Sequence, residues 1–222
     1  EFTMIKAVLF DFNGTLIDDG AYHAKAWLQM YKEITGEECD LLTFERRFNG
    51  RNNQLIIDDM SNHTLSREEN DRLSLHKEEI YRQFLVDDQV PLRAGVYELL
   101  DYLKENHIPF TIASASIKPN IDFFIENYHL ADYMDPTTIV YDDHLHPTKA
   151  SMYLDAAKRL NVNCEDCIIF EDSISGIKAG EEVHCDKLIV IENEVLAQEY
   201  KNHAIDYLSH DFHELLTYIK TL

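Results

Sequence analysis

The feature that most limits the fold of this chain is a regular alternation of short apolar runs with amphipathic segments after residue 94. The apolar runs have strand length, and the segments between them carry apolar residues at the helical period of 3.6. Repeated strand–helix units build a parallel sheet sandwiched between helices. We therefore predict an α/β fold with a doubly wound, Rossmann-like parallel sheet. The predicted strands are 5–10, 110–113, 138–140, 167–170, 188–191 and 205–208.

The stretch from residue 20 to residue 88 is predicted to be helical throughout, because no strand pattern occurs in it. Residues 41–60 show two short helical patterns. Ser66 and Glu69 have the spacing of a capping box, which predicts that a longer helix begins there. The residues expected on the buried face of that helix are Leu73, Ile80 and Phe84.

Two domains follow from this pattern. We predict an α/β core formed by residues 4–19 and 89–222, and a helical-bundle domain, residues 20–88, inserted into it. Residues 1–3 precede a methionine and are interpreted as a cloning remnant. No apolar run approaches the roughly 18 residues that span a bilayer, and no charged-then-apolar leader follows the methionine. We therefore expect a cytoplasmic protein.

The formal net charge of −21 argues against nucleic acid and anionic membranes as partners, because both require a basic surface. The same negative field repels an anionic substrate, so a site for one needs local cations or a bound metal ion. Acidic side chains can supply the ligands of that ion. We expect no nucleic-acid or membrane partner, and a monomer or weak oligomer.

Polar residues stand where four of the predicted units end or turn. The first strand ends at Asp11, the second at Ser114 and the fourth at Glu171 and Asp172, while the turn after the third leads to Lys149. Because the carboxyl ends of parallel strands share one edge, these side chains can face one another. Together they provide a nucleophilic carboxylate, a hydroxyl, an ammonium group and acids for a divalent ion, which suits phosphoryl transfer.

These residues resemble the four motifs of the haloacid dehalogenase superfamily, in particular its β-phosphoglucomutase-like branch with an inserted helical cap. The resemblance covers essentially the whole chain from Met4. It does not specify a substrate. The matching segments are Asp11-Phe12-Asn13-Gly14-Thr15, Ser114-Ala115-Ser116, Lys149 before a helix, and Glu171-Asp172-Ser173 followed by Gly176-Ile177.

The resemblance implies a role for each of these residues. Asp11 attacks phosphorus and forms an aspartyl-phosphate, and Ser114 and Lys149 hold the phosphate oxygens. Magnesium is held by Asp11, by the backbone carbonyl of Asn13 and by Asp172, with Glu171 close by. The family's Lys-Pro-x-Pro-Asp segment is replaced here by Lys149-Ala150-Ser151, which we interpret as a short deletion after the lysine.

Asn13 is the larger departure, because most members of the family carry a second aspartate there as general acid and base. An amide offers hydrogen bonds but exchanges no proton near neutral pH. Loss of general acid–base help costs about 10²–10⁴-fold in rate. The asparagine is natural, engineered as a trap, or open to deamidation before Gly14, and the sequence does not separate these origins.

The helical insert adds candidate substrate contacts by the same resemblance. Tyr22-His23-Ala24-Lys25-Ala26-Trp27 reproduces a segment that flanks the active site in β-phosphoglucomutase-like proteins, although packing between core and cap also explains His23. Arg51 can reach a substrate phosphate with its planar guanidinium. Asn53 is the nearest match to the arginine of the mutases. Lys77 matches a cap lysine by position, and an exposed helix lysine is an equally good interpretation.

In the core, Ala115, Ser116 and Lys118 lie beside the second motif and are further candidate substrate contacts by the resemblance. Lys118 is interpreted equally well as a solvated residue before a proline. We predict a Mg²⁺-dependent phosphatase acting on a small phosphorylated metabolite of the sugar-phosphate type. The alternatives are a hexose-phosphate mutase and a phosphometabolite-binding protein that has lost turnover at Asn13.

The four cysteines, Cys39, Cys164, Cys167 and Cys185, do not form a disulfide framework. Cys164 and Cys167 make a lone Cys-x-x-Cys pair, without the second pair that a zinc site requires. The sequence favours two reduced thiols at the start of a strand over zinc or redox chemistry.

Overall fold

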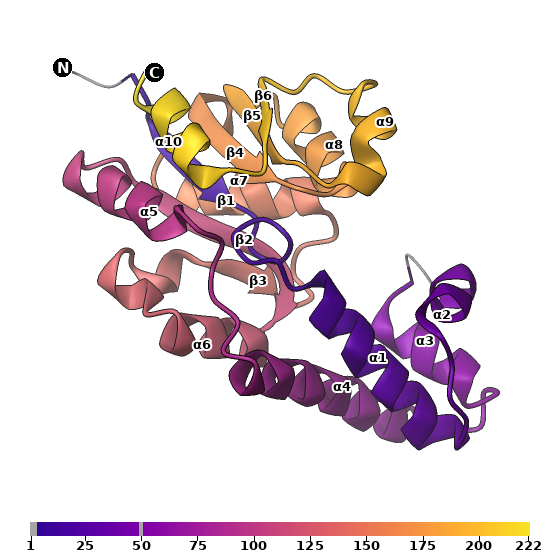
Figure 1. Ribbon diagram of the computed structural model, residues 1–222. Coiled ribbons are helices and arrows are strands. Elements are labelled where there is room, and N and C mark those ends of the chain that lie inside the picture. The colour runs from indigo at the N-terminus through magenta and orange to yellow at the C-terminus, as the bar shows by residue number, and fades with distance from the viewer. Residues whose placement is uncertain (1–3, 49–50) are drawn as a thin grey trace. The chain divides into compact units, whose positions relative to one another are not determined.

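The computed structural model describes residues 4–48 and 51–222 (Figure 1). Residues 1–3, the predicted cloning remnant, and residues 49 and 50 lie outside the described residues. The chain divides into two compact units, one formed by residues up to Asp18 and from Pro91 onward, the other by Asp19–Val90. Within the described ranges, no helix combines the length and the apolar character needed to cross a membrane.

The larger unit is built on one parallel sheet of six strands in the order β3-β2-β1-β4-β5-β6. β1 lies between β2 and β4, with Leu9 opposite Thr111 on one side and Ile169 on the other. The predicted doubly wound α/β fold is confirmed. The strands are β1 Ala7–Phe10, β2 Phe110–Ile117, β3 Val140–Asp142, β4 Cys167–Glu171, β5 Lys187–Ile191 and β6 Tyr207–Ser209.

Helices cover both faces of this sheet. The side chain of Leu9 faces a core formed with α7 and α8. On the other face Phe10 packs on Phe170, which stacks on Phe212 of α10 at 6.2 Å between ring centroids. The helices of this unit are α5 Val96–Glu105, α6 Lys118–Asn127, α7 Lys149–Arg159, α8 Ile174–Glu182, α9 Ala197–Tyr200 and α10 Phe212–Ile219.

Several boundaries differ from the sequence prediction, among them those of β2, β3 and α7. β2 does not end at Ser114 but continues to Ile117, with an irregularity in its pairing to β3 after Ala113. β3 begins at Val140 because the residues before it form a 3₁₀ turn capped by the side chain of Asp135. Lys149 is the first residue of α7 rather than a residue before it, because Thr148 provides the N-cap.

The smaller unit contains only helices in its described residues, as predicted for the insert. Its first helix ends at Gly36, whose φ of 75° is the left-handed conformation that glycine adopts without strain. Ser66 and Glu69 form the predicted capping box. The helices are α1 Gly20–Thr35, α2 Leu41–Phe48, α3 Asn53–Met60 and α4 Arg67–Asp87.

The buried face of α4 agrees with the predicted one only at Ile80, which is buried. Leu73 and Phe84 are only partly buried, whereas the polar residues Lys77 and Glu78 are buried and Tyr81 is completely so. Hydropathy assigns charged residues to the solvent face. It therefore misses a helix whose charged groups satisfy one another inside the unit.

Candidate active site

The loop that follows β1 begins with Asp11 at the carboxyl edge of the sheet, where its backbone N–H donates to the Phe170 carbonyl of β4 at 3.0 Å. A tight turn follows, in which the Phe12 carbonyl accepts from the N–H of Leu16 at 2.9 Å. Gly14 has a φ of 78°, and a Cβ there would lie 2.2 Å from Asp172 Oδ2. Glycine is therefore needed both for the turn and for the close approach of Asp172.

Three carboxylates meet at this edge: Asp11, Glu171 and Asp172 offer oxygens that all lie within 4.8 Å of one another. The Thr15 hydroxyl lies 3.1 Å from Asp11 Oδ2 and 3.0 Å from Asp172 Oδ1, so it links the loop to the end of β4. An all-oxygen donor set with several acidic members suits a hard divalent cation such as Mg²⁺. The residues present therefore fit this ion.

Lys149 is the cation of the cluster. Its Nζ donates to Asp11 Oδ1 and to the Ala113 carbonyl, both at 2.7 Å, and lies 3.6 Å from Glu171 Oε1. The position follows from the Thr148 cap, which starts α7 so that its first side chain points to the ends of β1 and β2. The short deletion predicted after this lysine does not remove its side chain from Asp11.

Glu171 is completely buried, and neighbours on several sides hold it in place. Its carboxylate accepts from the Tyr153 hydroxyl of α7 and, at 3.2 Å, from the backbone N–H of Asp172. Sequence analysis missed Tyr153, although its spacing of four residues from Lys149 places both on one helix face. Tyr153 thus joins the helix to the end of β4.

Gly176 of α8 supplies the space for this carboxylate. A Cβ there would lie 1.9 Å from Glu171 Cδ. We expect Gly176→Ala to lower the free energy of unfolding by about 1–3 kcal/mol, because overpacking forces the buried group to move. Urea unfolding measures the change.

Gly20→Ala is the matched control, because a Cβ at the start of α1 meets nothing within 4 Å. It should be neutral or stabilising by up to about 1 kcal/mol. If the two substitutions changed the free energy of unfolding equally, Gly176 would not be needed to leave space for the Glu171 carboxylate.

Asn13 lies beside the carboxylates with its side-chain oxygen turned to two hydroxyls. Ser116 Oγ donates to Asn13 Oδ1 at 2.6 Å and Ser114 Oγ at 3.2 Å. The Ser114 hydroxyl in turn accepts from the backbone N–H of Ser116 at 3.1 Å. The second motif and the asparagine therefore form one hydrogen-bonded group at the ends of β1 and β2.

The charges of this site are not balanced by protein groups alone. Burial raises the pKa of Glu171 to about 7 and that of Asp172 to about 8, and the charge of Asp11 adds to both shifts. Burial lowers the pKa of Lys149, but the charges of Asp11 and Glu171 outweigh this effect and the pKa is raised. An added cation would relieve the repulsion among the three carboxylates.

Four of the predicted contacts in the helical unit, His23, Trp27, Asn53 and Lys77, form one group. Lys77 Nζ lies 2.8 Å from His23 Nδ1 and 3.3 Å from Glu78 Oε1, and 5.0 Å from the centre of the Trp27 ring. Burial lowers the pKa of Lys77. Asn53 Nδ2 donates to Glu78 Oε1 at 2.9 Å. Lys77 is therefore not the exposed helix lysine of the alternative interpretation.

The remaining candidates lie on the surfaces of their units. Arg51 is exposed and its guanidinium donates to Asp59 Oδ2 at 3.1 Å. Lys118 is exposed and pairs with Asp122 at 2.6 Å, one turn along α6. Ala115 is exposed within β2. Each of these cations therefore has an acidic neighbour within its own unit.

The geometry at the sheet edge can be compared with known proteins. A family model described as haloacid dehalogenase-like hydrolase matches residues 5–184. The chain belongs to the haloacid dehalogenase-like hydrolases. This membership makes it an enzyme of the hydrolase class, and the resemblance drawn from the four motifs is confirmed.

Solved and curated relatives of this haloacid dehalogenase-like hydrolase extend over most of its length. A HAD hydrolase of family IA, variant 3, from Entamoeba histolytica is 35% identical, with a TM-score of 0.85, over 97% of this chain and 99% of that one. The 6-phosphogluconate phosphatase of Escherichia coli is 29% identical over 81% of each chain. The β-phosphoglucomutase of Bacillus subtilis is 28% identical over 79% of this chain and 78% of its own.

Proposed function

We propose that this haloacid dehalogenase-like hydrolase is a Mg²⁺-dependent phosphatase for a small phosphorylated metabolite of the sugar-phosphate type. The observation that carries the proposal is the position of Asp11, whose carboxylate stands between the ammonium of Lys149 and the carboxylates of Glu171 and Asp172. The phosphatase and mutase relatives support the same class of substrate.

In this proposal Mg²⁺ is held by Asp11, Asp172 and the Asn13 carbonyl, with Glu171 beside it. When bound, the ion neutralises phosphate charge and part of the chain's own negative field. Lys149 and Ser114 hold the phosphate oxygens, and Thr15 and Tyr153 keep the acidic side chains in place. Because the transition state of phosphoryl transfer is loose, positioning and charge neutralisation supply most of the rate.

The reaction itself takes place on Asp11. One carboxylate oxygen attacks phosphorus, the bond to the alcohol oxygen of the substrate breaks, and the alcohol leaves with a proton. Water then attacks the aspartyl-phosphate, which restores the carboxylate and releases inorganic phosphate. Both steps need a proton to move, and Asn13 cannot carry it. We therefore expect slow turnover and a long-lived phosphoenzyme.

The helical unit is proposed to act as a cap that recognises the rest of the substrate. Arg51 provides a cation on the surface of the unit, and His23, Trp27, Lys77 and Asn53 form a second group of candidate contacts. Cations on the cap would draw an anionic ester against the negative field of the chain. Asn53, the nearest match to the arginine of the mutases, donates a hydrogen bond to Glu78. The absence of an arginine at this position favours the phosphatase over the mutase.

A panel of phosphate esters tests the proposal, with inorganic phosphate measured in the presence of Mg²⁺ and in the presence of a chelator. The proposal expects release that depends on Mg²⁺ and is greatest for sugar phosphates. Conversion of β-glucose 1-phosphate only when a bisphosphate primer is added would favour the mutase. Saturable binding without release by either the chain or its Asn13→Asp variant would favour the binding protein.

The raised carboxyl pKa values predict how Mg²⁺ stabilises the protein at different pH. In the metal-free protein Glu171 keeps its proton up to about pH 7 and Asp172 up to about pH 8. In the unfolded chain both carboxyl groups release their protons near pH 4. Stability contributed by these groups is thus present at low pH and lost as the pH rises through this window. Because Mg²⁺ relieves the repulsion, its stabilising effect should be larger at about pH 8 than at about pH 6.

Thermal unfolding with Mg²⁺ or chelator at the two pH values measures this effect. In Asp172→Asn the amide does not titrate, so the difference between the two pH values should shrink. An equal increase of Tm by Mg²⁺ at both pH values in the original chain would contradict the prediction.

A further inference from the structure

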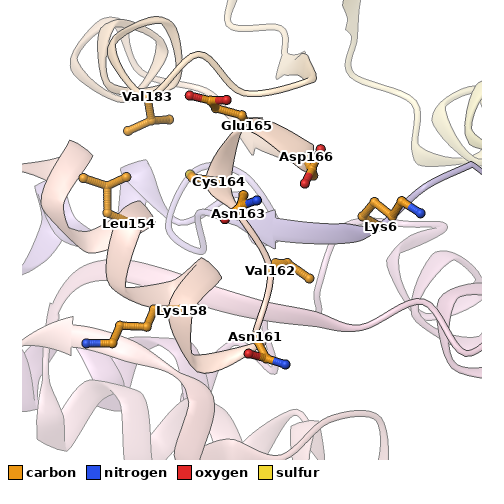
Figure 2. Close-up of a pocket in the computed structure, with 10 residues that line it drawn as sticks. All are labelled: Lys6, Leu154, Lys158, Asn161, Val162, Asn163, Cys164, Glu165, Asp166 and Val183. Atoms are coloured by element: carbon orange, nitrogen blue, oxygen red, sulfur yellow. The ribbon is translucent and has the colours of Figure 1, made fainter.

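A cavity of about 850 Å³ lies at the amino ends of the strands, away from the candidate active site (Figure 2). It is bordered by residues of α7, by the loop that leads into β4, and by the residue before β1. None of them has a part in the proposed reaction. The lining residues used below are Lys6, Lys158, Cys164, Glu165 and Asp166.

One thiol lines this cavity, and a second lies three residues further along the chain. Cys164 lines it and is 6% exposed, whereas Cys167, the first residue of β4, is completely buried. Residues Cys164–Asp166 form a 3₁₀ turn in which the N–H of Cys167 donates to the Cys164 carbonyl. Side chains three residues apart eclipse one another in such a turn, so both thiols project to the same side.

The spacing of this pair is that of a disulfide. A turn closed by a bond between its first and fourth residues brings their Cα atoms within about 7 Å. Disulfides need Cα atoms about 4.4–6.8 Å apart. Both residues belong to the same buried cluster, and Cys167 Sγ donates to the Asn163 carbonyl at 3.4 Å. Interaction with the Cys167 thiol lowers the pKa of Cys164, whereas interaction with Cys164 together with burial raises the pKa of Cys167. The thiol beside the cavity is therefore also the more acidic one.

We propose that Cys164 and Cys167 are a redox-active dithiol, oxidised to an intramolecular disulfide by a low-molecular-weight disulfide of the glutathione type. The Cys164 thiolate attacks one sulfur of glutathione disulfide, which forms a mixed disulfide and releases the first glutathione. Cys167 then loses its proton and attacks the Cys164 sulfur, which releases the second glutathione. Two electrons pass to the oxidant, and the two thiol protons end on the two glutathiones.

The surroundings of the pair favour this chemistry over reaction at the other thiols. Lys6 and Lys158 border the cavity together with Glu165 and Asp166, so the lining offers charges of both signs to the carboxylates and the ammonium group of glutathione. Cys185 is the third thiol of the larger unit, and burial raises its pKa to about 12, so it stays protonated at neutral pH. Its Sγ donates to the Lys187 carbonyl at 3.5 Å.

Peptide mass spectrometry after treatment with glutathione disulfide tests the proposal. The treated protein is quenched in acid, unfolded, alkylated and cleaved with trypsin, which releases residues 160–178 with only these two cysteines. We expect this peptide to lose the mass of two hydrogens and to escape alkylation. Reduction before alkylation should restore two alkylated thiols.

Single substitutions distinguish Cys164, the thiol that attacks the oxidant, from Cys167, the thiol that attacks the mixed disulfide. In Cys167→Ser the reaction should stop at the mixed disulfide, so the peptide carries one glutathione on Cys164. In Cys164→Ser the buried Cys167 should remain unmodified. Cys185→Ser should leave the disulfide unchanged. These readouts do not depend on phosphatase activity, so their failure is distinct from failure of the proposed function.

Cys39, a partly exposed thiol of the helical unit, is the internal check that the reagent is active. The proposal is overturned if Cys39 acquires glutathione while peptide 160–178 of the unsubstituted protein keeps both thiols. It is also overturned if the peptide becomes joined to the one containing Cys185.

Discussion

Asn13→Asp should raise the turnover of phosphate esters by about 10²–10⁴-fold, the usual contribution of a general acid and base. The substitution keeps the hydrogen bonds of this position, because Asn13 Oδ1 accepts from the hydroxyls of Ser114 and Ser116 and a carboxylate oxygen can accept the same bonds. What it adds is a group that can protonate the leaving alcohol and take a proton from the attacking water. Steady-state release of phosphate with Mg²⁺ measures the gain.

Asn13→Ala is the matched control, because it removes the amide without adding an acid, and we expect no gain from it. Intact-mass measurement of the starting protein shows whether part of it already carries aspartate through deamidation before Gly14. If Asn13→Asp turns over no faster than the unsubstituted chain, the missing proton donor is not what limits this enzyme.

Asp11→Asn in the Asn13→Asp background should abolish turnover, with a loss of at least about 10⁴-fold. The amide keeps the shape of the side chain but is no nucleophile, and it no longer balances the charge of Lys149 at 2.7 Å. The active background makes so large a loss measurable. Asp18→Asn is the matched control, because Asp18 is exposed in the same loop and its ion pair with Arg93 is long at 3.7 Å. Exposed ion pairs contribute little, so this substitution should change turnover less than about two-fold.

The unsubstituted chain offers a second measurement of the same claim. Because Asn13 cannot assist hydrolysis, phosphate should accumulate on Asp11. Acid quenching, cleavage with pepsin at low pH and mass spectrometry of the peptide that contains Asp11 would detect it. Phosphate on another residue, or full activity of Asp11→Asn, would contradict the assignment of the nucleophile.

The fold was predictable because the sequence alternates regularly between apolar runs of strand length and segments with a helical pattern. Six apolar runs separated by helical patterns allow a parallel sheet and little else, and the carboxyl ends of its strands necessarily meet at one edge. Asp11, Lys149, Glu171 and Asp172 lie together there for this reason. The shifted start of β3 arises from a local competition: the Asp135 side chain caps a 3₁₀ turn where propensity favours a strand.

The parts that sequence analysis missed depend on partners distant in the chain. Tyr153 has the pattern of a core residue, and only the fold shows that its hydroxyl meets Glu171. Lys77 has the pattern of a solvated residue, and only the fold brings His23, 54 residues away in the chain, to 2.8 Å from its ammonium group. A hydropathy pattern records which side chains avoid water but not which polar groups satisfy one another.

The central position of β1 has a consequence for how the protein folds. Leu9 pairs with Thr111 and Ile169, so the first strand to be synthesised has no neighbour until much later parts of the chain exist. The helical unit, whose contacts lie within Asp19–Val90, can form in the meantime from nearby residues. During synthesis the apolar strand Ala7–Phe10 therefore stays unpaired until β2 emerges, and one of its edges stays open until β4 follows, which exposes the nascent chain to aggregation.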